Sequence, residues 1–345
     1  PELGAAHTQL ARWCPSDYAD GASVMAGARR PSPREISNAV VPQIESVPNR
    51  NGASDFLWQW GQFLDHDIDL TDAADPPEPE PIAVPSGDPF FDPSATGTEL
   101  IPFNRSIYVK ATGDVEPRQQ LNEITHWIDG SNVYGSEDER AALLRTNDGT
   151  GKLLVSDGNL LPFNEEGLVN AGGDSPDLFV AGDLRANEQV GLTAVHTLFV
   201  REHNRLADEI AERDPRLSGD EIYERARQIV AAQMQVVTYE EFLPTLLGSG
   251  ALAPYNGYNP NTDARISNLF SGAVFRLGHS MLSGTLLRVD ENANEIAEGH
   301  LPLRHAFFAP SRIVEEGGIE PLLRGLALQT CQQIDVQVVD DVRNF

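Results

Sequence analysis

Residues 54–71 (SDFLWQWGQFLDHDIDLT) follow a helical period of about 3.6 residues per turn. Two neighbouring stripes of this helix are mainly apolar. The third stripe holds Trp58, Gln62, Asp65, His66 and Asp69. A face that carries an amide, carboxyls and an imidazole is not suited to packing alone. We therefore predict one helix over 54–71 in which Gln62, Asp65 and His66 face a bound group, whereas Asp67 faces something else.

Four further segments have helical patterns. Residues 188–213 place an apolar stripe along a long helix, and Ser218 with Glu221 forms a capping box that begins the next. This second helix is expected to run towards Tyr239 and to stop before Pro244. Residues 264–283 predict a helix whose core stripe consists of Ile266, Phe270, Ala273, Leu277 and Met281. Residues 319–332 predict another.

The rest of the chain has little regular pattern. Prolines interrupt residues 1–51, and residues 72–97 are rich in proline and acids, which predicts a long surface loop. Only a short extended run stands out at 106–110. Several long helices with long irregular connections and little β predict a mainly α fold, formed by residues 1–345 as a single domain.

The segment LNEITHWIDGSNVYG (121–135) carries a second polar pattern. Thr125, Trp127, Asp129 and Ser131 alternate, so in an extended chain they point the same way. They offer two hydroxyls, a backbone carbonyl and a carboxylate, which are oxygen donors that Ca²⁺ prefers. A strand with one polar face explains the same pattern equally well.

Histidines and one arginine complete the candidate chemistry. His196 and His203 lie seven residues apart, about 10 Å along a helix, which is too far to share one ion and favours buried hydrogen-bonding roles. His279 lies near Gly272, Ala273 and Gly278, whose small size lets a flat body approach the backbone. Arg185 follows a short apolar run and a Gly-Asp pair, a common arrangement that is weak evidence alone.

Composition narrows the class of protein. The formal charge of −27 argues against nucleic acid or an anionic membrane as a partner. It fits a secreted, salt-tolerant or calcium-associated protein, and equally a merely solvated acidic surface. Cys14 and Cys331 are the two cysteines, expected to be unpaired and buried, and no run of residues is apolar enough to span a membrane. The abrupt ends at Pro1 and Phe345 predict a fragment of a longer protein.

Two helices that each offer a histidine, with an arginine between them and a glutamate three residues later, suggest a haem site. A proximal histidine ligates iron, and a distal histidine and arginine act on peroxide. The alternative from the residues alone is a generic α-helical domain.

With these motifs the chain resembles the animal haem peroxidase family, and in particular its bacterial members. Five motifs occur in the family's order and cover nearly the whole chain: WGQFLDHDIDLT (60–71), IDGSNVYGS (128–136), FVAGDLRANE (179–188), HTLFVREHNRLA (196–207) and FRLGHSML (275–282). The resemblance implies a secreted or extracellular peroxidase domain, truncated at both ends, that contributes to the response to oxidative stress. Its expected substrates are hydrogen peroxide and small anionic or organic electron donors.

The resemblance also implies roles for particular residues. His66 and Arg185 match the distal pair, Gln62 matches the glutamine above the haem, and His279 matches the proximal iron ligand. Arg276 is expected beside the cofactor, haem b. Asp65 and Glu188 match carboxylates that form ester bonds to haem. The family's calcium site matches a set of five: Asp67, Thr125, Trp127, Asp129 and Ser131.

Two departures from the family pattern change the expectation. Gln189 stands where one member has a methionine joined to haem as a sulfonium, so at most two ester links are expected and chloride oxidation should be weak. The asparagine that accepts a hydrogen bond from the proximal histidine would lie after Phe345. The alternatives are a fatty-acid dioxygenase of the same fold, which needs a tyrosine where this chain has Arg276, or an inactive calcium-stabilised matrix or adhesion domain.

Overall fold

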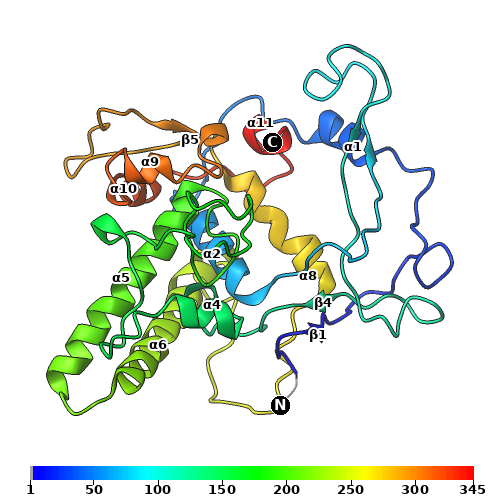
Figure 1. Cartoon of the computed structure of the whole chain (residues 1–345). Helices are drawn as coiled ribbons and strands as arrows, with labels where there is room; N and C mark the ends of the chain where they lie inside the picture. Colours follow the sequence, from blue (N-terminus) through cyan, green and yellow to red (C-terminus); the bar gives the residue numbers. More distant parts are fainter. Residues whose placement is uncertain (1–2) are drawn as a thin grey trace.

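The computed structural model describes residues 3–345 and is mainly helical (Figure 1). The α-helices are α1 (Pro33–Val40), α2 (Phe56–Ile68), α3 (Ser131–Tyr134), α4 (Asp138–Leu143), α5 (Val190–Arg213), α6 (Gly219–Val236), α7 (Leu243–Leu247), α8 (Asn268–Gly272), α9 (Ser311–Val314), α10 (Glu320–Leu328) and α11 (Asp340–Arg343). The 3-10 helices are η1 (Asp157–Asn159), η3 (Val274–Met281) and η4 (Leu303–His305), and η2 (Val237–Phe242) is a π-helix. The predicted fold class is confirmed.

Regular β-structure is confined to short pairs within the described chain. The strands are β1 (Thr8–Gln9), β2 (Ile82–Ala83), β3 (Leu100–Ile101), β4 (Leu121–Asn122), β5 (Thr285–Leu286) and β6 (Leu301–Pro302). They pair antiparallel as β1 with β4, β2 with β3, and β5 with β6. The strands therefore fasten loops to one another rather than form a layer. This agrees with the prediction of little β.

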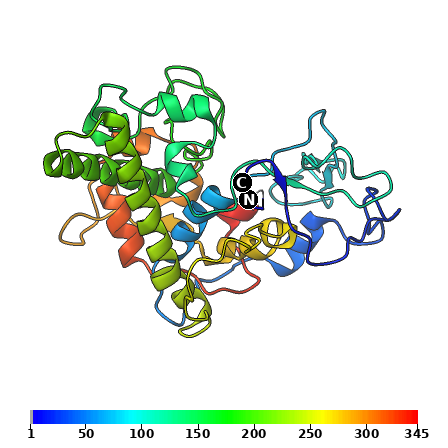
Figure 2. The same ribbon diagram turned by 90° about the horizontal axis from the view of Figure 1, so that it is seen from below.

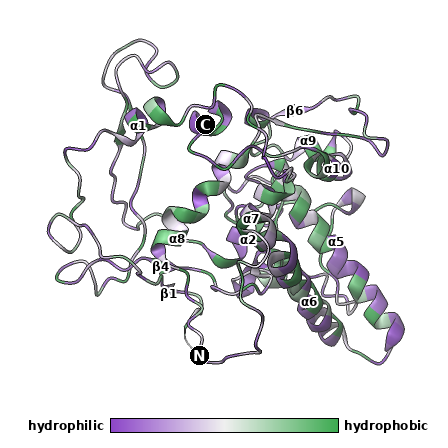
Figure 3. Ribbon diagram, turned by 180° about the vertical axis from the view of Figure 1, so that it is seen from behind, coloured by the Kyte–Doolittle hydropathy of each residue, from purple (hydrophilic) through white to green (hydrophobic). Residues whose placement is uncertain are grey.

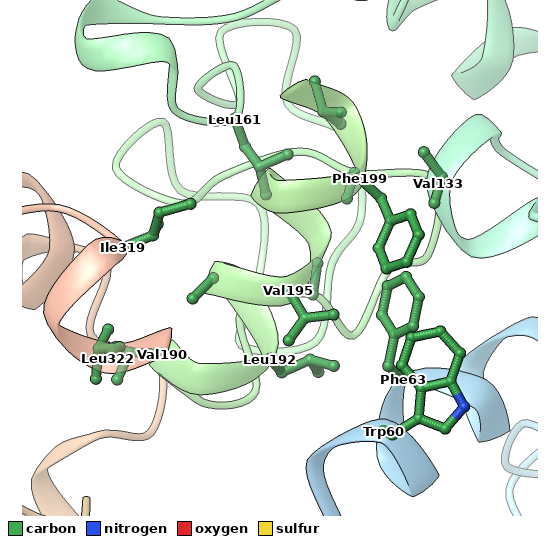
Figure 4. Packing of buried hydrophobic residues seen from close by; sticks show 14 of the residues in the cluster. Trp60, Phe63, Val133, Leu161, Val190, Leu192, Val195, Phe199, Ile319 and Leu322 are labelled. Carbon is green, nitrogen blue, oxygen red and sulfur yellow. The ribbon is translucent and has the colours of Figure 1, made fainter. Parts of the chain in front are cut away.

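Helix α2 forms as predicted, although it is shorter at both ends. Its apolar stripes are buried because the helix packs against α5 (Figure 4). Phe63 is fully buried and stacks on Phe199 with ring centroids 5.0 Å apart, and Trp60 lies 5.9 Å from the same ring. Truncating a buried phenylalanine costs about 3–5 kcal/mol, so Phe63 is a main attachment of α2 to the core.

Helix α5 lies at the centre of the helical part and contacts α2, α3, α6 and α10. It begins two residues later than predicted because Gln189 caps it, its side-chain oxygen accepting a hydrogen bond from Gly191 N. Figure 3 shows the alternation of apolar and polar positions along α5 and α6. The predicted capping box at Ser218 and Glu221 is present at the start of α6.

The α6 helix does not stop before Pro244 as predicted. It continues through η2, a π-helical segment, into α7, where Pro244 occupies the first turn. The Thr238 hydroxyl donates to Met234 O and accepts from Trp60 Nε1 in this region. The wider helical turn avoids the clash that a proline ring makes with the preceding turn of an α-helix.

The predicted helix over residues 264–283 is wrong in its length and continuity. Only α8 is α-helical there, and Ala273 (φ −141°, ψ −61°) separates it from η3, which is a 3-10 helix. Of the predicted core stripe, Met281 is buried, whereas Ala273 is exposed. Several apolar residues of this segment line a cavity as well as packing against the core, so their spacing need not follow one continuous α-helix; they are Phe275, Leu277, Met281 and Leu282.

Long irregular segments lie to one side of the helical part, as Figures 1 and 2 show in blue and cyan. Helix α1 within them was not predicted. Its Arg34 is buried and forms a two-pronged ion pair with Asp88, with Nε–Oδ2 at 2.6 Å and Nη2–Oδ1 at 3.1 Å. This pair attaches α1 to the proline-rich loop. No helix within residues 3–345 is long and apolar enough to cross a membrane.

The two cysteines are unpaired, as predicted. Cys331 is buried, but Cys14 is exposed, which corrects the expectation that both are buried.

Candidate active site

A cavity of about 750 Å³ lies between α2 and η3. The polar stripe predicted for α2 lines it completely, with Trp58, Gln62, Asp65, His66 and Asp69 all at its surface. Asp67 is absent from this lining. The hypothesis that the stripe faces a bound group and that Asp67 faces elsewhere therefore agrees with the geometry. The opposite wall comes from η3, and a third side from residues 184–189.

His66 lies at the inner end of the α2 stripe and is 4% exposed. Its Nδ1 is 3.5 Å from Asp183 Oδ1, and its Nε2 is 3.7 Å from Glu188 Oε2. Burial lowers the pKa of His66 well below its ordinary value, and the nearby Arg185 charge lowers it further. The imidazole is therefore neutral near pH 7 and can accept a proton.

Arg185 reaches the cavity from the loop before α5 and is paired with Asp183. Its Nε and Nη2 donate to the two carboxylate oxygens at 2.9 and 2.8 Å, and its backbone N donates to Oδ1 at 2.8 Å. Burial alone would raise the pKa of Asp183, but the Arg185 guanidinium and His66 hold it below its usual range. The two side chains form a fixed, charged unit.

Sequence reasoning missed Asp183. The signal was present in the GDLR motif, because an acid at the end of a buried run needs a partner and an arginine two residues later supplies one. The Gly-Asp turn was interpreted only as a common turn. The structure places this carboxylate within reach of both His66 and Arg185.

Asp65 and Glu188 project into the cavity, as expected of residues that reach a cofactor. Burial, together with the nearby Asp69 charge, raises the pKa of Asp65 to about 7, and burial also raises the pKa of Glu188. Both groups therefore hold their protons more readily than ordinary carboxyls do. Asp69 accepts a hydrogen bond from Ser271 Oγ at 3.0 Å, which connects α2 to α8 across the cavity edge.

Gln62 is held in place by Gln189, another residue whose contact the sequence did not predict. Gln189 Nε2 donates to Gln59 Oε1 at 2.6 Å and to Gln62 Oε1 at 3.1 Å. The Gln62 carbonyl oxygen is thereby occupied, and its amide N–H groups remain available to the cavity. Gln189 therefore connects the start of α5 to α2.

His279 and Arg276 lie on η3 and line the opposite wall. Burial lowers the pKa of His279, and Arg276 lowers it further, which favours the neutral imidazole that binds metals. Arg276 Nε donates to Ser271 O at 3.0 Å. Gly278 lines the cavity, and a Cβ placed there meets no atom within 4 Å, so the backbone is open at this point. Gly272 and Ala273 are not part of the lining.

The predicted calcium residues come together on the far side of α2. Asp67 accepts from the backbone N of Asp129 and Gly130 at 3.1 Å each, and from Ser131 Oγ at 2.9 Å. Thr125 Oγ1 donates to Asp129 Oδ2 at 2.9 Å. Burial, together with the nearby Asp129 charge, raises the pKa of Asp67 to about 7. The Asp129 charge therefore disfavours ionisation of Asp67.

The segment that supplies these residues is not extended, which corrects the prediction. It bends, turns at Gly130 (φ 78°) and enters α3 at Ser131. Ser131 N donates to Asp129 Oδ1, so local side-chain hydrogen bonds replace a strand ladder. Trp127 is 40% exposed, which leaves its backbone carbonyl as its candidate donor. Over residues 3–345 no cluster of three or more His, Cys, Asp or Glu side chains has metal-binding geometry. The side chains that lie together here are the carboxylates of Asp67 and Asp129 and the hydroxyls of Thr125 and Ser131.

His196 and His203 are both buried, as predicted, but only one has hydrogen-bond partners. His203 Nε2 lies 2.9 Å from Gly151 O, a carbonyl that only accepts, so this nitrogen carries the proton and Nδ1 accepts from the Tyr134 hydroxyl at 2.9 Å. His196 has no hydrogen-bond partner and presents its ring to Phe63.

Comparison with known proteins agrees with this arrangement. The sequence model of the animal haem peroxidase family matches residues 1–345. Human eosinophil peroxidase is 38% identical over 391 residues, which covers 100% of this chain and 54% of that protein. The solved structure of peroxidase A from Dictyostelium discoideum superposes with a TM-score of 0.89 at 31% identity, and covers 99% of this chain and 68% of that one.

The fold also occurs outside peroxidases. Fatty acid alpha-dioxygenase from Arabidopsis thaliana matches with a TM-score of 0.74 at 19% identity over 96% of this chain and 54% of that one, a likeness of fold alone. The chain spans between a quarter and about half of the length of the curated relatives it matches. The family match over the whole chain establishes the relationship: this chain belongs to the animal haem peroxidase family.

Proposed function

We propose that the chain is the catalytic domain of a haem-dependent peroxidase, which reduces hydrogen peroxide and oxidises a halide, a pseudohalide or a small organic donor. One observation carries this proposal. A single cavity has His66, Arg185 and Gln62 on one side and His279 on the other. Acid–base groups facing a metal-binding imidazole across a cavity are what peroxide chemistry on haem requires.

The residues around the cavity fit haem b. Its volume lies in the range of ligand pockets, and the wall near His279 is apolar, with Phe275, Leu277 and Met281 at its surface. The open backbone at Gly278 leaves room for a flat ring beside η3. His279 would hold the iron, Arg276 would lie beside the cofactor, and bound haem would supply an iron centre able to take up the oxidising power of peroxide.

The chain's own residues would move the proton. His66, neutral and buried, would accept a proton from one peroxide oxygen and return it to the other, departing oxygen. Arg185 stabilises the negative charge that develops on that departing oxygen. Gln62, whose carbonyl is occupied by Gln189, turns N–H donors towards a water or halide in the cavity.

We also propose that Asp65 and Glu188 form ester bonds to methyl groups of the haem. Each carboxyl oxygen would replace one methyl hydrogen, in a two-electron oxidation for which one hydrogen peroxide would be the oxidant and would be reduced to water. Both lie at the cavity surface, and both hold protons more readily than ordinary carboxyls. Gln189 offers no sulfur for a third link, so weak chloride oxidation is expected and bromide, iodide, thiocyanate or organic donors are favoured.

A calcium ion is proposed at Asp67, with Thr125, Trp127, Asp129 and Ser131 as the other ligands. Hard oxygen donors and two adjacent carboxylates support this choice. The acidic surface, with a net charge of −27, supports a secreted or extracellular protein and argues against nucleic acid as a partner.

A visible spectrum of the haem-loaded chain tests the function, followed by hydrogen peroxide and then a panel of halides. We expect a Soret band that changes on peroxide addition and returns when a donor is added. His66→Ala should retain the haem spectrum and lose the reaction with peroxide. An undiminished reaction in that variant contradicts the role of His66, and absence of a Soret band favours an inactive matrix or adhesion domain.

A fatty-acid dioxygenase is disfavoured because Arg276 stands three residues before His279, where a radical-forming tyrosine is needed.

A further inference from the structure

We propose that Asp183 is a positioning residue that fixes Arg185 and His66 relative to one another and selects the His66 tautomer with the proton on Nδ1. This inference rests on the proposed peroxidase function for its kinetic consequence, but its structural content does not. Asp183 is not among the residues expected to contact haem or peroxide. It acts through its two neighbours.

The hold on Arg185 is specific. Three hydrogen bonds of 2.8–2.9 Å join the Asp183 carboxylate to the side chain and backbone of Arg185. A two-pronged guanidinium–carboxylate contact fixes both the position and the plane of the guanidinium. Asp183 is 5% exposed, so water does not compete for its oxygens. The direction in which Arg185 enters the cavity is therefore set by Asp183.

The backbone of Asp183 is itself anchored. Its N–H donates to Asn132 O at 2.9 Å. The preceding residue, Gly182, lies so close to α3 that a Cβ added there would be 2.5 Å from Ser131 O and 2.6 Å from Tyr134 N. The carboxylate is thus carried by a segment pressed against the first turn of α3. It cannot shift without separating these two backbones.

The same carboxylate is the closest charged group to His66 Nδ1, at 3.5 Å. This distance is long for a hydrogen bond and marks an electrostatic contact. A carboxylate only accepts, so the N–H dipole is stabilised when it lies on Nδ1. The Nε2 lone pair then faces Glu188 and the cavity, where a peroxide proton would be taken up.

The other charged or titratable groups near His66 do not select this tautomer. Arg185 and Arg276 are cations that contact neither ring nitrogen within hydrogen-bond distance, and the ring nitrogens of His196 have no hydrogen-bond partner. Glu188 Oε2 lies 3.7 Å from Nε2, which is beyond hydrogen-bond distance and farther than Asp183 Oδ1 lies from Nδ1.

The first experiment determines the tautomer in the full chain without added haem. ¹⁵N-histidine labelling gives signals for eight histidines, and the variant His66→Gln identifies the one of interest. We expect a protonated Nδ1 and an unprotonated Nε2. A His66 signal with the proton on Nε2 overturns the proposal, and this result does not require any altered Asp183 variant to fold.

The second experiment compares Asp183→Asn with Asp177→Asn, a control in the same segment where the acid is exposed. In Asp183→Asn we expect mixed tautomers and a loss of about 10- to 100-fold in the rate with peroxide after haem loading, because small misplacements of catalytic groups have effects of this order. The KM for the electron donor should stay within about twofold, since the donor does not contact Asp183. Asp183→Glu should restore the Nδ1 proton signal. An unchanged tautomer in Asp183→Asn contradicts the proposal, as does an equal loss in the control. If the native chain has its proton on Nδ1 but does not react with peroxide after haem loading, the proposed function is wrong and the positioning role of Asp183 still holds.

Discussion

Replacing Gly182 with alanine tests how closely the arginine segment depends on α3. The glycine has ordinary backbone torsions, so the requirement for glycine here is steric. A Cβ would lie 2.5 Å from Gly135 N and from Ser131 O, and 2.6 Å from Tyr134 N. All three are backbone atoms, which cannot rotate away as a side chain would. The two segments must move apart until these contacts reach the 3.4 Å of ordinary van der Waals contact.

The cost of this separation has two parts. Overpacking of a well-packed interior destabilises by about 1–3 kcal/mol, and the backbone character of the neighbours places Gly182→Ala at the upper end. A displacement of roughly 1 Å is also passed to Asp183 and Arg185, which follow directly in the chain. A misplacement of about 1 Å can reduce the rate of an enzyme by about 100-fold. Activity should therefore fall further than the loss of folded protein explains.

Thermal unfolding and the rate of reaction with peroxide are measured on the same haem-loaded samples. The matched control is Gly219→Ala, in which the new Cβ would meet Gly149 O, C and Cα at 2.7, 2.8 and 2.9 Å. This clash is also with backbone, but it lies at the start of α6, away from the cavity lining. We expect both variants to melt earlier and only Gly182→Ala to lose most of its rate while folded. A wild-type rate in folded Gly182→Ala, or an equal loss in Gly219→Ala, refutes the reasoning.

Three further predictions concern stability and covalent chemistry. Asp88→Asn should lower the free energy of unfolding at pH 7 by about 3–5 kcal/mol, because it leaves Arg34 buried without its partner. Hydrogen bonding to Arg34 lowers the pKa of Asp88, so this stability is fully present above the ordinary carboxyl pKa of about 3.9 and is lost as the pH falls towards the lower folded-state value; melting curves should show a constant difference between the variant and the native chain down to about pH 4, and a difference that narrows as the pH falls further. Calcium at about 100 times its dissociation constant should stabilise the chain by about 2.7 kcal/mol, and Asp67→Asn should remove most of that gain in thermal unfolding with added CaCl₂. If calcium does not change the unfolding of the native chain, the site is ruled out. Acid-acetone extraction should leave haem on the protein after turnover with peroxide, and should release it from a variant that lacks both Asp65 and Glu188; freely extractable haem in the native chain excludes the ester bonds.

The sequence predicted α2 and its polar face because the whole helix is enclosed by other parts of the chain. Each stripe has a distinct environment, so the period of the pattern carries the information. It failed over residues 264–283 for a related reason. Much of η3 faces a cavity, and the apolar residues there are retained for lining that space rather than for packing at a helical period.

Contacts between distant segments were beyond the sequence. Hydrogen bonds bring Thr125, Asp129 and Ser131 close to Asp67. The extended conformation was wrong because Gly130 and the Asp129 side chain favour a turn. The unsatisfied nitrogens of His196 likewise depend on which groups the fold brings near the ring. Local pattern predicts what a side chain offers, and only tertiary structure decides what it meets.

One residue explains why α2 can carry two buried polar faces at once. The backbone N–H of Asn132 donates to Asp67 Oδ1 at 3.2 Å, and its side-chain amide donates to Phe63 O at 2.7 Å. Its carbonyl accepts from Asp183 N at 2.9 Å. The turn that satisfies Asp67 on one side of α2 therefore also fixes the segment that carries Asp183 and Arg185 beside His66 on the other. Adjacent residues on α2 serve different ligands in our proposal, yet one residue, Asn132, contacts the surroundings of both, so a disturbance at the proposed calcium site has a short covalent and hydrogen-bonded route to the distal pair.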